Sequence, residues 1–168
     1  MRPHINRTSP PLQMPSLRSQ MRATSAGLLW LLVFAFFLRV LGQALVAFLD
    51  VGFLPPMAEW YSGLMPYPVL LPTQLLILAA QVKIGIDIQR GWGFFAGSHP
   101  KVGRFLCGFS YVYFASMVIR YVVTMGMYPE RRWFHGTIPI FFHCVLAAYL
   151  YLLGQYYESS DEQPVNRA

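Results

Sequence analysis

The sequence predicts an all-α, polytopic integral membrane protein with four transmembrane helices in a bundle. Of its 168 residues, 55% are hydrophobic and only 12% are charged, which is about half the charged share of a soluble domain. Four apolar runs also reach the length of about 20 residues that a membrane-spanning helix needs. Little of the chain is left outside these runs, so we expect no soluble catalytic domain and no nucleic-acid partner.

The two ends of the chain are predicted to lie outside the helical domain. Residues 1–25 are rich in Pro, Ser and Arg and hold no acidic residue, which indicates a disordered basic tail. An organelle transit peptide has a similar composition. Four prolines in this segment disfavour the amphipathic helix of such peptides, so we favour the tail. Residues 158–168 form a polar C-terminal tail, and residues 26–157 form the transmembrane domain.

The apolar runs place the four spans at about residues 26–49, 67–88, 105–127 and 134–156. Lys83 and Asp87 are four residues apart near the end of the second span, so we expect them to pair or to reach the lipid headgroups. The connection around residues 53–74 holds five of the thirteen prolines and a group of aromatic residues, but no lysine or arginine. Such aromatic residues are typical of a membrane–water interface.

The positive charges predict the orientation of the chain. The N-terminal tail has four arginines and the second connection has three basic residues, whereas the first connection has none and the third has two. Because basic residues favour the cytoplasmic side, seven charges against two place both termini in the cytoplasm. The first connection then lies on the outer side of the membrane.

Polar residues of all four spans are expected at a similar depth in the outer half of the bilayer. Arg39 and Gln43 are one turn apart on one face of the first span. At about 1.5 Å per residue, Gln74 and Arg120 lie about 10 Å from the outer ends of their spans, and His143 about 13 Å. This agreement in depth is the strongest functional signal in the sequence.

Two arginines inside apolar spans require compensation. Each costs about 2.5–3.5 kcal/mol on insertion scales, so an uncompensated pair is unfavourable. The acidic residues on the outer side are Asp50, Glu59 and Glu130. They could pair with the arginines and simply lock the helices together. Alternatively, one arginine binds an anionic ligand such as a lipid phosphate, which we favour because charges inside membranes usually serve function.

His143 admits several roles, of which the simplest is a neutral imidazole bonded to a neighbouring helix. A haem bound by two histidines needs two imidazoles at one depth. No second histidine lies at the depth of His143. We therefore expect no cofactor and no metal on this chain alone, and a haem shared with a second chain stays a weaker alternative.

The leading hypothesis is a small membrane protein with a polar pocket in the outer leaflet that binds an anionic lipid or small amphiphile. The residues expected to line or cap this pocket are Arg39, Gln43, Gln74, Arg120, His143, Glu59, Trp60 and Tyr61. Whether the protein also transforms the ligand stays open; His143 and Glu59 are the candidate acid–base groups. The alternative is an accessory subunit of a larger membrane complex, and a homo-oligomer also stays open.

Overall fold

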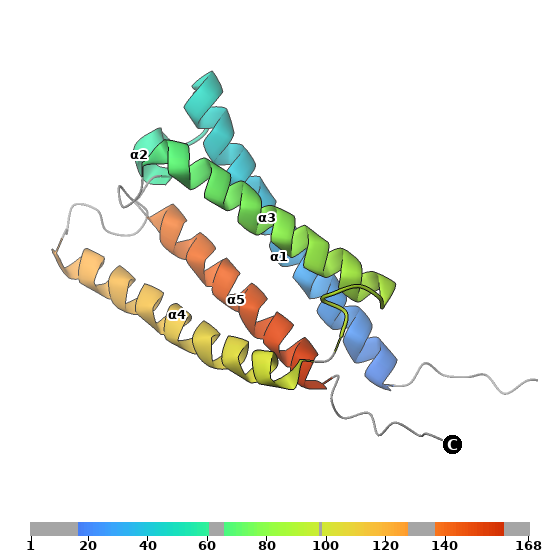
Figure 1. Ribbon diagram of the computed structural model, residues 1–168. Coiled ribbons are helices and arrows are strands. Elements are labelled where there is room, and N and C mark those ends of the chain that lie inside the picture. Colours follow the sequence, from blue (N-terminus) through green and yellow to red (C-terminus); the bar gives the residue numbers. More distant parts are fainter. Residues whose placement is uncertain (1–16, 61–65, 98, 128–136, 160–168) are drawn as a thin grey trace, which may run out of the picture.

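The computed structural model describes residues 17–60, 66–97, 99–127 and 137–159. Within these ranges the chain forms helices and no strand (Figure 1). The helices are α1 Leu17–Leu49, α2 Met57–Trp60, α3 Tyr67–Arg90, α4 Pro100–Met127 and α5 Thr137–Ser159. The prediction of an all-α chain is confirmed.

Four of the helices are long and apolar enough to cross a membrane. Their candidate spans are Thr24–Leu49, Tyr67–Arg90, Pro100–Met127 and Thr137–Ser159, close to the four expected from the sequence. α1 begins at Leu17, inside the segment 1–25 that we assigned to a tail, and α4 begins five residues before the expected residue 105. Residues 1–16 and 160–168, which make up most of the two predicted tails, lie outside the described residues.

The ends of α3 follow from its sequence. Pro66 precedes the helix and Pro68 lies in its first turn, where the missing N–H of proline has no helical acceptor to bond. The helix ends at Gly91, whose φ of 70° is left-handed and whose N–H donates to the carbonyls of Asp87 and Ile88. Glycine adopts this conformation without the steric cost that a Cβ would add.

The helices pack in the order α3, α1, α5, α4 (Figure 1). α1 contacts α3 on one side and α5 on the other, whereas α4 packs against α5 alone among the described helices. The core between α1 and α5 consists of Leu29, Val33, Tyr149, Leu153 and Tyr157. α3 joins this core through side chains, since the Tyr149 hydroxyl donates to the carbonyl of Gln81 at 3.3 Å.

α4 approaches α5 closely because small residues line their contact. A Cβ added to Gly103 would lie 2.8 Å from the carbonyl oxygen of Gly154. The reverse also holds, since a Cβ on Gly154 would lie 2.9 Å from the carbonyl oxygen of Gly103. Glycine at both positions therefore lets the two backbones meet, as small residues do between membrane helices.

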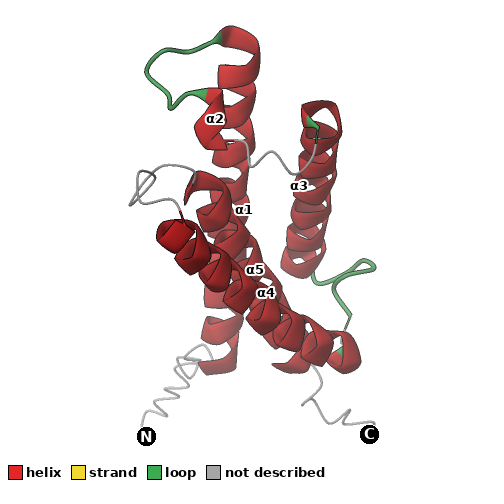
Figure 2. Cartoon of the chain, turned by 90° about the vertical axis from the view of Figure 1, so that its left-hand side faces the viewer, coloured by secondary structure: helices red, strands yellow, loops and turns green. Residues whose placement is uncertain are grey.

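The beginning of α1 and the end of α5 lie at one end of the molecule, and α2 lies at the other (Figures 1 and 2). Four long helices that alternate in direction bring the beginning of α1 and the end of α5 to the same end. α2 is a single turn that contacts α1 and α5. We refer below to the α2 end and the opposite end of the molecule.

Candidate functional site

Arg39, Gln43 and Gln74 form a hydrogen-bonded group between α1 and α3, which we call the Arg39 cluster. Nη1 of Arg39 donates to Oε1 of Gln43 at 3.1 Å, and Nε2 of Gln74 donates to the same oxygen at 3.1 Å. The three residues are 5%, 0% and 4% exposed. Three residues that the sequence placed at one depth are therefore in contact, and their side chains are buried.

The chemistry of the three side chains fixes how their amides are oriented. A guanidinium group only donates, so the amide group of Gln43 must turn its oxygen toward Arg39. That oxygen also faces Gln74, which must therefore offer its amide nitrogen. Nε of Arg39, Nε2 of Gln43 and Oε1 of Gln74 are then left buried without a hydrogen-bond partner. The cluster thus presents unpartnered donors on α1 and one unpartnered acceptor on α3.

Within the part of the chain that the structure describes, no carboxylate pairs with Arg39. Its hydrogen bond uses Nη1, and Nε is buried without a hydrogen-bond partner. One face of the group lies over the ring of Phe142 on α5, 5.7 Å from the ring centroid. A ring face attracts the cation, but it supplies no hydrogen-bond acceptor.

The acidic residues expected to compensate Arg39 do not do so in the described residues. Asp50 is exposed and has a left-handed backbone with a φ of 46°. Glu59 is half-buried in α2 and interacts with a group other than Arg39. Glu130 lies outside the described residues. The simple interpretation in which two acidic residues lock the arginines in place is therefore unsupported for Arg39.

Trp60 packs against α1 near the cluster. Its side chain is buried, and its indole N–H donates to the carbonyl of Pro55 at 2.9 Å. The ring lies against Gly42, where an added Cβ would come within 2.6 Å of it. Gly42 directly precedes Gln43, so Trp60 contacts α1 one residue from the cluster. Tyr61, the other aromatic residue expected there, lies outside the described residues.

His143 and Arg120, two further residues expected at the site, lie on α5 and α4. Nδ1 of His143 donates to the carbonyl of Pro139 at 2.5 Å, because a carbonyl can only accept. In a neutral ring Nε2 is then an acceptor. The centroid of the ring lies 6.0 Å from that of Tyr113 on α4. Arg120 is half-buried and makes no hydrogen bond among the described residues.

Two further buried polar groups point to residues that the site prediction left out. Gln81 shares its face of α3 with Gln74, as the spacing of seven predicts, and it is 3% exposed. Neither Nε2 nor Oε1 of Gln81 has a partner. The hydroxyl of Tyr67, seven residues before Gln74, is also buried and unpartnered. The spacing of Tyr67, Gln74 and Gln81 along one face could have identified all three.

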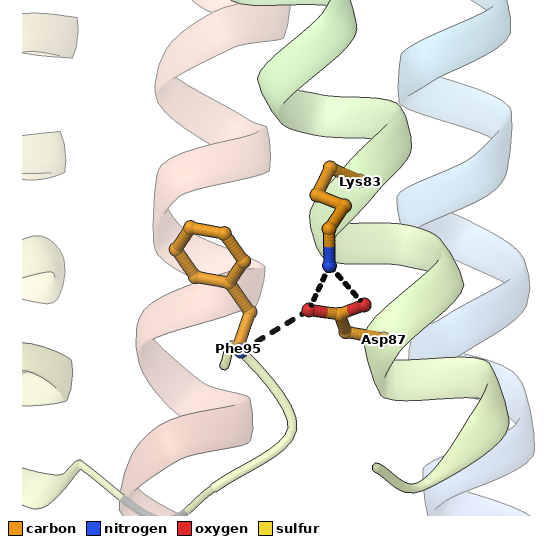
Figure 3. A network of polar contacts seen from close by, with 3 residues as sticks. All are labelled: Lys83, Asp87 and Phe95. Atoms are coloured by element: carbon orange, nitrogen blue, oxygen red, sulfur yellow. Dashed lines mark hydrogen bonds and ion pairs between the residues drawn. The ribbon is translucent and has the colours of Figure 1, made fainter. Parts of the chain in front are cut away.

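Lys83 and Asp87 form the predicted pair near the opposite end of the molecule. Nζ of Lys83 lies 2.5 Å and 2.7 Å from the two carboxylate oxygens of Asp87 (Figure 3). Asp87 also accepts a hydrogen bond from the backbone N–H of Phe95 at 3.3 Å. The Asp87 carboxylate is therefore satisfied on the protein itself and ties the connection after α3 to that helix. It lies at the other end of the molecule from α2 and is not part of the Arg39 cluster.

Side chains that commonly bind metals do not gather in groups of three anywhere among the described residues. Comparison with known proteins adds no assignment, since no family model, curated protein or solved structure matches the chain. The geometry of the Arg39 cluster is therefore the observation on which a functional proposal rests.

Proposed function

We propose that this is an integral membrane protein whose Arg39 cluster binds an anionic lipid or a similar anionic amphiphile. The observation that carries the proposal is a buried arginine that has no carboxylate partner among the described residues, beside a second unpartnered donor on Gln43. Donors left unpaired in an apolar environment are costly, and an anionic oxygen satisfies both.

The surroundings of the cluster favour an amphiphile over a small soluble anion. Large apolar side chains close to it in the sequence are exposed, and they are Leu38, Leu41 and Leu75. The most apolar window of α4 is only 6% buried inside the protein, and that of α3 only 17%. Surfaces of this kind suit contact with hydrocarbon chains, which would bring the anionic headgroup to the cluster from the membrane.

The distribution of positive charge supports an orientation with both termini in the cytoplasm. The α2 end, which lies after the first candidate span, is then on the outer side. Gln43 and Arg39 lie about two and about three turns before the end of α1 at Leu49, so the headgroup would be bound between the middle of the bilayer and its outer surface.

The test compares lipids retained by three forms of the protein after extraction in mild detergent. Native mass spectrometry of the unaltered protein should show one anionic lipid per chain. Arg39→Met should lower the retained fraction at least tenfold, because charge-assisted hydrogen bonds are lost. Arg104→Met is the matched control, since Arg104 is exposed on α4, and it should leave the fraction unchanged. Retention by Arg39→Met equal to that of the control would contradict the proposal.

The alternative function, an accessory subunit of a larger complex, is favoured by one observation on α4. A ladder of aromatic rings runs along α4, with centroids of Phe105 and Phe109 6.0 Å apart and those of Phe109 and Tyr113 5.7 Å apart, and its two phenylalanines are exposed. Such a ladder suits a helix of another protein as well as it suits lipid. Co-purification of foreign membrane subunits in fixed ratio, without a bound anionic lipid, would support this alternative.

A further inference from the structure

The unpartnered atoms of the Arg39 cluster specify more than a negative charge. We propose that its ligand is an anionic amphiphile whose headgroup carries a hydroxyl beside the anionic oxygens, as a phosphatidylglycerol does. This inference rests on the proposed function and adds the chemical class of the headgroup. It follows from counting which atoms of the cluster can donate and which can only accept.

The donors lie on α1. Nε of Arg39 and Nε2 of Gln43 are buried and have no partner. Both can donate a hydrogen bond to the oxygen atoms of a phosphate diester or a carboxylate.

The acceptor lies on α3 and cannot be satisfied by the same oxygens. Nε2 of Gln74 is engaged with Gln43, so Oε1 of Gln74 remains, and it can only accept. Turning the Gln74 amide around would set its oxygen against the oxygen of Gln43. An ionised phosphate diester has no proton to donate. A ligand that satisfies the whole cluster therefore needs a donor next to its anionic group.

The donor is a hydroxyl rather than an ammonium group. Arg39 is already a buried cation. No carboxylate pairs with it among the described residues. A second positive charge from an ethanolamine headgroup would be repelled, whereas a neutral hydroxyl would not be. The charges thus favour an anionic headgroup with a hydroxyl over a zwitterionic one.

The experiment is a competition between lipids with identical acyl chains in mixed micelles, read by native mass spectrometry. Phosphatidylglycerol and phosphatidylmethanol carry the same charge, but only the first has a hydroxyl. The unaltered protein should prefer phosphatidylglycerol about fivefold, the value of one net hydrogen bond. Equal binding of the two lipids would overturn the inference and leave the proposed function intact. Binding of neither lipid would contradict both.

Variants assign the preference to Gln74. The Gln74→Met variant should still bind both lipids, but with about equal affinity for phosphatidylglycerol and phosphatidylmethanol. The Gln89→Met variant, altered at an exposed position on the same helix, should keep the fivefold preference. A Gln74→Met variant that keeps the preference would overturn the assignment. The comparison on the unaltered protein stands without any variant, so a folding defect does not remove the test.

Two further competitors test whether the headgroup must be anionic and whether the acyl chains contribute to binding. Phosphatidylethanolamine should compete at least tenfold less well than phosphatidylglycerol, and preference for it would overturn the charge argument. Glycerophosphoglycerol supplies the same phosphate diester and hydroxyl groups from a soluble source. Displacement of phosphatidylglycerol by an equal concentration of glycerophosphoglycerol would show that the acyl chains add nothing, and would overturn the amphiphile as ligand.

Discussion

Replacing Gly154 by alanine is expected to weaken the attachment of α4 to α5. A Cβ at this position would lie 2.9 Å from the carbonyl oxygen of Gly103, 3.0 Å from the backbone nitrogen of Cys107 and 2.7 Å from its Sγ. Two of these three atoms belong to the backbone of α4, so a side-chain rotation cannot relieve the contact. The two helices must move apart, and α4 has no other helix among those described to hold it.

The magnitude follows from two opposing effects. Overpacking of a close contact costs about 1–3 kcal/mol, while alanine gains up to about 1 kcal/mol over glycine in a helix interior. Gly108→Ala on α4 is the matched control, because a Cβ at Gly108 would meet nothing within 4 Å. The difference in unfolding free energy between the two variants therefore isolates the clash, and we expect Gly154→Ala to be about 1–3 kcal/mol less stable.

Reversible unfolding in mixed micelles of SDS and a mild detergent measures this difference. Limited proteolysis of the folded protein gives a second measurement, in which the connections at the ends of α4 should be cleaved faster in Gly154→Ala. Equal stability and equal cleavage of the two variants would refute the close approach of α4 and α5 at this glycine.

Two further predictions concern buried polar groups of α3. Lys83→Met removes the partner of the Asp87 carboxylate, so we expect a lower unfolding free energy and faster hydrogen exchange at the amide of Phe95. Gln81→Met replaces two buried atoms without partners by an apolar side chain of similar size, so we expect a gain of about 1 kcal/mol or more in thermal unfolding measurements.

The controls for these two variants are exposed residues. Lys101→Met on α4 should leave both the stability and the exchange at Phe95 unchanged, since Lys101 is exposed. Unchanged stability and unchanged exchange at Phe95 in Lys83→Met would mean that the Asp87 carboxylate does not depend on Lys83 as a partner. A loss of stability in Gln81→Met would show that the Gln81 amide has a partner, such as a bound water or a ligand group, that the variant removes.

Much of the fold could be predicted from the sequence because apolar runs of membrane length are a strong signal. Helical spacing also predicted the contact of Arg39 with Gln43 and that of Lys83 with Asp87, since residues four apart on a helix are neighbours. The meeting of Gln74 with the first pair agrees with their similar depth, but it also required the two helices to turn these faces toward each other. For the pairs within one helix, the sequence spacing determines the geometry directly.

The rest depends on how the helices pack, which spacing within one helix does not determine. The order α3, α1, α5, α4 results from which surfaces fit, such as the glycines where α4 meets α5. The sequence did not indicate that the helix of Arg120 would pack against α5 alone among the described helices. It also did not indicate that the donors of Arg39 and Gln43 would lack a carboxylate among the described residues, because that depends on where the acidic residues of the connections lie.

The most direct test of the central claim locates a bound anionic lipid on the chain. A phosphatidylglycerol analogue with a photoactivatable group near its headgroup can be crosslinked to the protein in native membranes, and the labelled peptides can be identified by mass spectrometry. We predict labelling of α1 near Arg39 and Gln43 and of α3 near Gln74, and loss of this labelling in Arg39→Met. Labelling confined to the exposed face of α4, or unchanged in Arg39→Met, would contradict the account.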